Sequence, residues 1–205
     1  MTTPEHAMLA VSLTAAVRLH ERFGAAVLFT AAAAAVAPDW DGLAGIVDLR
    51  HFDHGHRVWG HGLLPAVLAG GLIAAADWAT GASRRAAAAL RTLDGTRPFL
   101  IGRPTCATSA CVGIAAAVSH LPADIVVSGA DGIEDWPVSV LWPLPGPQVV
   151  YPMLRWGDPG PTAVFVLAAF AAASGRLSAT AAARWGLTPL VIYLAIGRVR
   201  ILAGG

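Results

Sequence analysis

The stretch Cys106 to Val127, CATSACVGIAAAVSHLPADIVV, decides how the whole chain is interpreted. It is long enough to cross a bilayer, which takes about 20 consecutive apolar residues in a helix. It also contains His120 and Asp124, which are four residues apart and therefore share one helix face. Ionisable groups inside a membrane helix are costly and are usually functional. The stretch predicts a membrane helix with a functional polar pair, the alternative being a pair that only ties helices together.

Composition extends this interpretation to the whole chain. The 205 residues suffice for one domain, and we expect residues 1–205 to form a single membrane-embedded unit. A hydrophobic content of 56%, a charged content of 13% and a mean hydropathy of +0.60 exceed the usual values for a water-soluble domain. The net charge of +1, with no basic run that has interleaved aromatic residues, argues against nucleic acid as a partner. The bilayer is the expected partner.

Six apolar runs follow one another along the chain and predict an all-α polytopic bundle of five or six membrane helices. Arg198 and Arg200 interrupt the last run, so its crossing of the membrane is left open. The runs are 7–19, 24–37, 62–79, 106–127, 162–174 and 187–203.

Arginine placement predicts the orientation of this bundle. All fourteen basic residues are arginine, and most of those in the loops fall on one side of the alternating topology. The positive-inside rule makes that side cytoplasmic. The polar residues of the other side would then face outward from the inner membrane of a bacterium. The arginines of the predicted cytoplasmic side are Arg18, Arg22, Arg84, Arg85, Arg91, Arg97, Arg103, Arg176 and Arg184.

The predicted outer side contains the densest polar segment, HFDHGHRVWGH at 51–61, which holds four of the seven histidines. On one continuous helix His56 and His61 would point about 140° apart. They can converge if His56 lies in a loop and His61 lies at the start of the next helix. A loop ligand beside a helix ligand is a plausible half of a metal site. The alternative is a surface loop whose histidines have no role.

Other candidate ligands fall on the same side. Asp39 and Asp41 of the sequence PDWD could turn both carboxylates in one direction, although Asp beside Pro and Gly is also ordinary turn chemistry. Imidazoles and carboxylates without thiolates suit zinc, manganese or iron, as one ion or two. The predicted metal ligands, or partners that orient them, are His6, Asp39, Asp41, His56, His61, His120 and Asp124.

Arg57 lies among these ligands in the sequence. Its planar guanidinium fork suits a phosphate group or an orienting carboxylate. We expect Arg57 and Asp41 to be the catalytic residues. The alternative for Arg57 is a surface arginine paired with Asp53.

Five short motifs in this order resemble the YdjM-like family of inner-membrane proteins, which are described as metal-dependent hydrolases. They are His6, PDWD at 38–41, HRVWGH at 56–61, SHLPAD at 119–124 and LWPL at 141–144. The resemblance covers about residues 5–145. It implies a likeness to zinc-dependent phospholipase C, and for some members a link to the LexA damage response.

The motifs also differ from the family pattern at four glycine or valine positions. Gly42 stands where the family has histidine, which predicts one ligand fewer unless His51 or His54 replaces it. Val58, Gly60 and Gly62 replace a family Gly, Thr and Ser.

Together, the residues and the resemblance predict a membrane-bound metal-dependent hydrolase. It would cleave a phosphoester of a lipid or lipid-like substrate with a metal-activated water, and Arg57 would hold the phosphoryl oxygens. A metal-stabilised scaffold or regulatory interaction protein is the main rival. An ion transporter is the third possibility, and it would require further polar residues toward the inner face, where the Cys106 to Val127 helix has only Ser and Thr.

Overall fold

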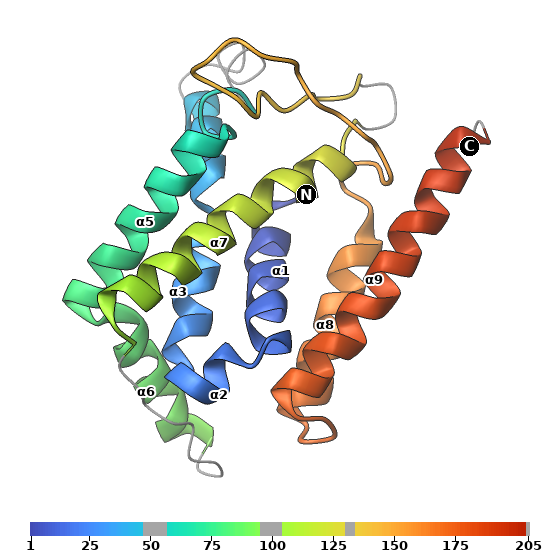
Figure 1. Ribbon diagram of the computed structural model, residues 1–205. Coiled ribbons are helices and arrows are strands. Elements are labelled where there is room, and N and C mark those ends of the chain that lie inside the picture. The colour runs from blue at the N-terminus through green and yellow to red at the C-terminus, as the bar shows by residue number, and fades with distance from the viewer. Residues whose placement is uncertain (47–56, 95–103, 130–133, 204–205) are drawn as a thin grey trace.

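The computed structural model describes residues 1–46, 57–94, 104–129 and 134–203. In these ranges the chain is helical, and its only extended pairings are two isolated β-bridges. This confirms the predicted all-α class (Figure 1). The helices are α1 (Thr3–Ala16), α2 (Leu19–Phe23), α3 (Ala26–Ala35), the 3₁₀ segment η1 (Ala37–Ile46), α5 (Leu63–Thr80), α6 (Ala82–Asp94), α7 (Cys106–Val126), α8 (Pro159–Ala173) and α9 (Ala179–Leu202).

Three of the described helices are long and apolar enough to cross a membrane, namely α5, α7 and α9. The first two coincide closely with predicted apolar runs. Helix α9 begins eight residues before the predicted run and continues through Arg198 and Arg200 without a break. The hydroxyl of Ser178 caps it by accepting a hydrogen bond from the Ala181 amide. The remaining apolar runs form the shorter helices α1, α3 and α8.

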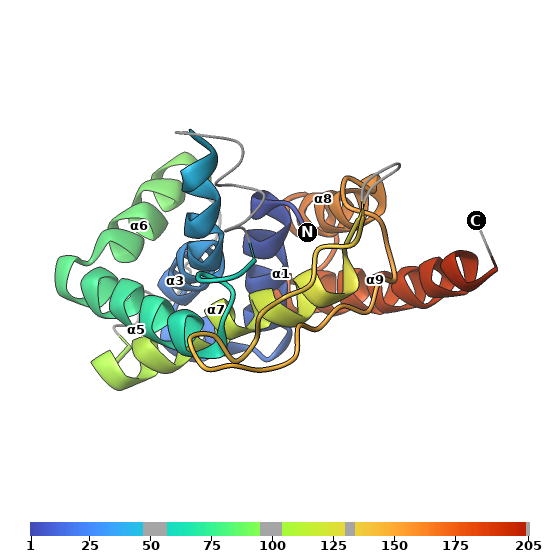
Figure 2. The same cartoon turned by 90° about the horizontal axis from the view of Figure 1, so that it is seen from above.

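Successive apolar helices run in alternating directions (Figure 1). The N-terminus, η1 and the 134–158 segment lie at one end of the bundle, which we call the site end. Helices α2 and α6 and the turn between α8 and α9 lie at the opposite end, which we call the arginine-rich end. Figure 2 shows the α8–α9 pair set apart from the group formed by α3, α5, α6 and α7, with α1 between them.

Helix α1 sits in the core because its neighbours present small side chains. Ala10 of α1 is buried with Ala31 and Ala34 of α3 and with Val112 and Ala116 of α7. Small residues let membrane helices approach closely. The resulting van der Waals packing drives their association, because the hydrophobic effect does not act between helices in lipid.

Helices α5 and α7 meet at two glycines. A Cβ atom added to Gly70 would lie 2.5 Å from the carbonyl oxygen of Gly113, and one added to Gly113 would lie 2.4 Å from that of Gly70. Ala74 and Ala117 pack beside them, one turn further along each helix. This close backbone contact holds α7, and therefore His120 and Asp124, against the start of α5.

The segment 134–158 folds over the C-terminal end of α7. The last carbonyls of a helix have no partners within it, and here amides of this segment supply them. The amide of Tyr151 donates to the Ile125 carbonyl at 2.9 Å, and the amide of Met153 donates to the Val126 carbonyl at 2.8 Å. The segment thereby covers the end of the helix that carries Asp124.

Candidate metal centre

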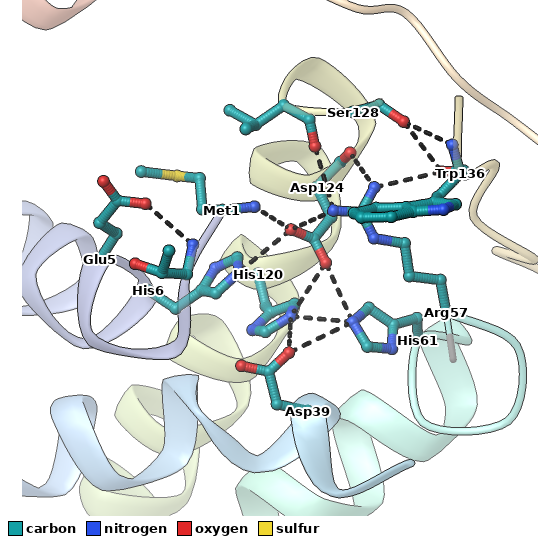
Figure 3. A network of polar contacts seen from close by, with 12 residues as sticks. Met1, Glu5, His6, Asp39, Arg57, His61, His120, Asp124, Ser128 and Trp136 are labelled. Carbon is teal, nitrogen blue, oxygen red and sulfur yellow. Dashed lines mark hydrogen bonds and ion pairs between the residues drawn. The ribbon is translucent and has the colours of Figure 1, made fainter. Parts of the chain in front are cut away.

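Six of the seven predicted ligands come together at the site end, although they belong to four separate segments. Figure 3 labels these ligands except Asp41. They are His6 on α1, Asp39 and Asp41 in η1, His61 just before α5, and His120 and Asp124 on α7. The seventh, His56, lies outside the described residues, as do His51 and His54.

Four donor atoms of this group converge on one point. Nε2 of His61 lies 3.0 Å from Nε2 of His120 and 3.0 Å from Oδ2 of Asp124. Nε2 of His120 lies 3.3 Å from Oδ2 of Asp124 and 3.3 Å from Oδ1 of Asp39. The separation between His61 Nε2 and Asp39 Oδ1 is 3.7 Å. Ligands about 2 Å from a tetrahedral ion are about 3.3 Å from one another, so this spacing fits a first-row divalent metal.

The second nitrogen of each of these imidazoles is already engaged. Nδ1 of His120 lies 2.7 Å from the carbonyl oxygen of Ala35, which can only accept, so this nitrogen donates. Nδ1 of His61 lies 2.8 Å from Oδ2 of Asp41. In the neutral rings both Nε2 atoms then present lone pairs to each other. A hydrogen bond from the far nitrogen to a carbonyl or carboxylate is the usual support of a metal-binding histidine.

His6 approaches the cluster from the other side of Asp124. Its Nε2 lies 3.1 Å from Oδ1 of Asp124, and its ring stacks on that of His120 with centroids 3.4 Å apart. Its Nδ1 is buried without a hydrogen-bond partner among the described residues. One donor atom from each of His6, Asp39, His120 and Asp124 lies within 4.8 Å of the others, so His6 also belongs to a possible ligand set.

The cluster has an excess of negative charge in a buried place. Asp39, Asp41 and Asp124 bring three carboxylates, against the guanidinium of Arg57 and the amino group of Met1, which contacts Asp124. Burying like charges is unfavourable unless a cation compensates them. Burial raises the pKa of Asp39, but hydrogen bonds from His120 and His61 outweigh it and hold that pKa well below its usual range.

His61 shows the opposite effect of the same charges. Burial alone would lower its pKa, but the carboxylates of Asp124, Asp39 and Asp41 raise it from 6.5 to about 10. The metal-free cluster therefore holds a proton on His61 at neutral pH. A divalent cation would take the place of that proton.

Arg57 is buried and contacts backbone carbonyls at the end of α7. Its two terminal nitrogens donate to the carbonyls of Asp124 and Val127, each at 3.0 Å, and to that of Trp136 at 3.1 Å. One of them lies 3.2 Å from Oδ1 of Asp124, and the guanidinium stacks over the Trp136 ring. Burial lowers the Arg57 pKa, while Asp124 acts to raise it. Arg57 thus positions Asp124, and its predicted catalytic role stays a prediction.

Some contributors to the site carry little sequence signal. The Ala35 carbonyl that orients His120 belongs to an alanine run, where no side chain indicates its role. Thr3 donates to Oδ2 of Asp39 at 2.6 Å. Its spacing of three residues from His6, which puts both on one face of a helix, was the available clue. Ser128 contacts both the amide and the carbonyl of Trp136, and these two contacts hold Trp136 over Arg57.

Two of the departures from the family motifs coincide with close backbone approaches. A Cβ atom on Gly60 would lie 2.2 Å from the Pro38 carbonyl oxygen, and one on Gly62 would lie 2.6 Å from that of Trp142. The Gly60 amide also donates to Oδ2 of Asp41 at 3.1 Å. Glycine at these positions lets the segment before α5 lie directly against η1, which brings His61 to Asp41.

Asp39 is the most accessible member of the cluster. Its side chain is 16% exposed, whereas those of His61, His120 and Asp124 are at most 1% exposed. Next to it, the exposed Trp40 packs against Trp59 with ring centroids 5.0 Å apart. The cluster is therefore closest to the surface at Asp39.

Comparison with known proteins identifies the family of this chain. No curated protein and no solved structure matches the chain. The model of the YdjM inner membrane protein family matches residues 1–203, which is almost its full length. The helices that are long enough to cross a membrane agree with that description. The chain belongs to the YdjM inner membrane protein family.

Proposed function

We propose that this protein is a metal-dependent hydrolase of the inner membrane, and that it cleaves a phosphoester of a lipid or lipid-like substrate. The observation that carries the proposal is the convergence of the Nε2 atoms of His61 and His120 on oxygens of Asp39 and Asp124. The donor set suits zinc, with manganese or iron as alternatives. The additional histidine, His6, would be a further ligand if a second ion binds.

The residues of the cluster have separable roles in this proposal. A divalent ion would supply an activated water and polarise a phosphoryl oxygen. Asp41 and the Ala35 carbonyl hold the two imidazoles in the orientation that binds the ion. Asp39, the most accessible carboxylate, faces the entering substrate. Asp41 and Arg57 remain our candidates for the catalytic residues, although their contacts also support an orienting role.

The substrate class follows from location. The metal centre lies near the ends of α1, α5 and α7 at the site end, close to where a membrane protein meets lipid headgroups. The arginine bias supports an outward orientation of this end. A phosphoester of a headgroup is therefore the nearest chemical group that such a site can attack.

A closed structural metal site is the alternative, and the near-complete burial of the cluster favours it. A structural site is filled by protein ligands, whereas a catalytic site keeps one position for water. In a scaffold the ion would tie α1, η1, α5 and α7 together without turnover.

The test combines metal content with turnover. Wild type, His61→Ala and His120→Ala are purified in detergent, analysed for transition metals, and assayed on phospholipids and on generic phosphodiesters. We expect about one or two ions per chain in wild type and loss of most metal and activity in both variants. Full metal retention in both variants would exclude the site. Metal-replete wild type without turnover would favour the scaffold.

Arg57 separates the two functions further. If it stabilises transition-state charge, Arg57→Ala keeps the metal and loses activity by about 10²-fold, and Arg57→Lys recovers part of it. If it only holds the end of α7, both variants lower the thermal midpoint, because the carbonyls of Asp124, Val127 and Trp136 lose their donor. Turnover unaffected by Arg57→Ala would remove Arg57 from the mechanism.

A further inference from the structure

An apolar cleft of about 250 Å³ lies between α1 and the α8–α9 pair, away from the metal centre. Ser12 carries the only polar side chain among its lining residues. The α8–α9 wall consists of Phe165 and of six alanines, which fill little space, so the helices leave an open cleft between them. The six alanines are Ala168, Ala169, Ala172, Ala179, Ala182 and Ala183.

The cleft suits an apolar chain better than water. A buried water needs two to four polar partners, and the lining side chains offer one hydroxyl. A dry cavity of about 150 Å³ holds a benzene molecule, so this larger cleft can hold a longer apolar segment. From Ala7 to Ala15 the lining covers about 12 Å of α1. That is close to the roughly 15 Å hydrocarbon depth of one leaflet.

Arginines surround the end of the cleft that lies at the arginine-rich end of the bundle. Arg184 follows the lining residue Ala183, and its Nε donates to the carbonyl of Ala16 at 3.0 Å, which places it between α9 and α1. Arg176 lies in the turn between α8 and α9. Arg18 is nearby, three residues after Ala15.

One acidic residue faces the same region and is already engaged. Glu21 pairs with Arg18 at 2.6 Å and accepts a hydrogen bond from Thr180 at 2.6 Å. Arg176 and Arg184 therefore leave an excess of positive charge beside the mouth. A basic residue at this depth attracts the phosphate of an anionic lipid.

The cleft and the metal centre lie on opposite sides of α1. Relative to His6, the lining positions Met8, Val11 and Ala15 point about 140° to 200° around the helix. A lipid in the cleft would accordingly not present its phosphoester to the His/Asp cluster. The cleft is a separate site, whatever reaction the cluster carries out.

We infer that this cleft binds an anionic phospholipid, with one acyl chain along α1 and the phosphate beside Arg176 and Arg184. The lipid would fill the space between α1 and the α8–α9 pair and fix their distance. Because the cleft does not include any predicted metal ligand, the inference does not depend on the proposed hydrolase activity.

The experiment uses a phosphatidylglycerol with a photoactivatable diazirine in one acyl chain. The full-length protein is reconstituted in phosphatidylcholine vesicles that contain this probe, irradiated, and mapped by peptide mass spectrometry. We expect the adducts to concentrate on α1 between Met8 and Ala15 and on α8 between Phe165 and Ala172. A phosphatidylcholine with the same diazirine chain should label these segments less.

Paired variants locate the effect. Ala169→Leu with Ala172→Leu fills the cleft and should remove most of the adducts. Ala171→Leu with Ala173→Leu places the same side chains at positions of matching exposure that do not line it, and should not. Arg176→Gln and Arg184→Gln should each reduce the labelling by phosphatidylglycerol about fivefold, the effect of one basic residue at an anionic surface. Arg155→Gln, at the site end, should not change it.

Wild type alone can overturn the inference, even if a variant fails to fold. Adducts spread evenly over the lipid-facing residues of α8 and α9 would mean ordinary bilayer contact. Equal labelling by the two lipid probes would remove the headgroup assignment. Persistence of the α1 adducts in the well-folded, cleft-filled variant would exclude the cleft as their origin.

Discussion

At the scale of single residues, the metal centre depends on hydrogen bonds that lie behind the ligands. Asp41 contacts Nδ1 of His61, which is not one of the four converging atoms, and the amide of Gly60. Such a carboxylate fixes the ring orientation and increases the basicity of the metal-binding nitrogen. The role of Asp41 as a metal ligand or an orienting partner stays a prediction, and these two contacts favour the orienting role.

Asp41→Asn tests this role. The amide keeps the shape but loses the charge, so we expect the metal to bind about 10- to 100-fold more weakly, with the fold retained. Competition with a chromophoric chelator measures the affinity. Asp158→Asn is the control, because Asp158 caps α8 and contacts Tyr193, on another helix pair. Unchanged affinity in Asp41→Asn would show that His61 needs no orienting carboxylate.

The pKa of His61 predicts how the metal-free protein responds to pH. Its folded-state pKa of about 10 exceeds the ordinary 6.5, so the protonated ring stabilises the fold. This contribution is complete below pH 6.5 and is lost as the pH rises toward 10. We expect the thermal midpoint in detergent with chelator to fall over that interval, and to fall less in His61→Asn. If the thermal midpoints of metal-free wild type and His61→Asn depended equally on pH, the stabilising role of protonated His61 would be contradicted.

At the scale of elements, the contact between α5 and α7 positions the ligands of the metal centre. Gly113 and His120 are seven residues apart, about two turns along the same helix. A displacement of α7 at the glycine contact would therefore move His120 and Asp124 relative to His61. The two helices can come this close only because Gly70 and Gly113 have no side chains.

Adjacent glycines of α5 provide a matched test. A Cβ atom on Gly70 would lie 2.5 Å from the Gly113 carbonyl oxygen, whereas one on Gly71 would meet only Ile114, at 3.7 Å. We expect Gly70→Ala to cost about 1–3 kcal/mol of stability through overpacking and to lower metal content. Gly71→Ala should be neutral or should stabilise by up to about 1 kcal/mol through helix propensity. Thermal midpoints and metal analysis compare the two variants. Equal stability and metal content in both would argue against the Gly70–Gly113 contact.

The sequence predicted the elements well where hydropathy and helix length coincide, as in α5 and α7. It missed the first turns of α9 because hydropathy marks the apolar part of a helix, while the helix itself starts at the Ser178 cap. Helix α6 was expected only as an arginine-bearing connection. Between its arginines lies an alanine-rich segment that helix propensity would have identified.

The site was predictable to the level of side-chain types and their common end of the bundle. His120 and Asp124 followed from helix spacing, and the approach of His61 followed from its place before α5. The backbone acceptors, such as the Ala35 carbonyl, could not be predicted, since carbonyls carry no sequence signal. The burial of Arg57 was also missed, because it depends on the 134–158 segment folding over the end of α7.

At the scale of the whole molecule, the polar groups are divided between the two ends of the bundle. The metal centre and the 134–158 segment occupy one end, and α2, α6 and the α8–α9 turn with most of the described arginines occupy the other (Figure 1). The cleft that we propose for an anionic lipid has Arg184 beside it, between α9 and the end of α1. If both proposals hold, one chain offers lipid contacts of different chemistry to the two leaflets.

The arginine bias predicts the orientation of the bundle in the membrane, and labelling can test it. In a chain whose Cys106 and Cys111 are replaced by alanine, single cysteines are placed at Leu144, at the site end, and at Leu90 on α6, which are both exposed. Because the arginine-rich end should be cytoplasmic, we expect a membrane-impermeant thiol reagent to label Leu144→Cys in spheroplasts and Leu90→Cys only after lysis. Equal labelling of both after lysis is the control for accessibility. The reverse pattern would turn the metal centre toward the cytoplasm, where its substrate would have to come from the inner leaflet.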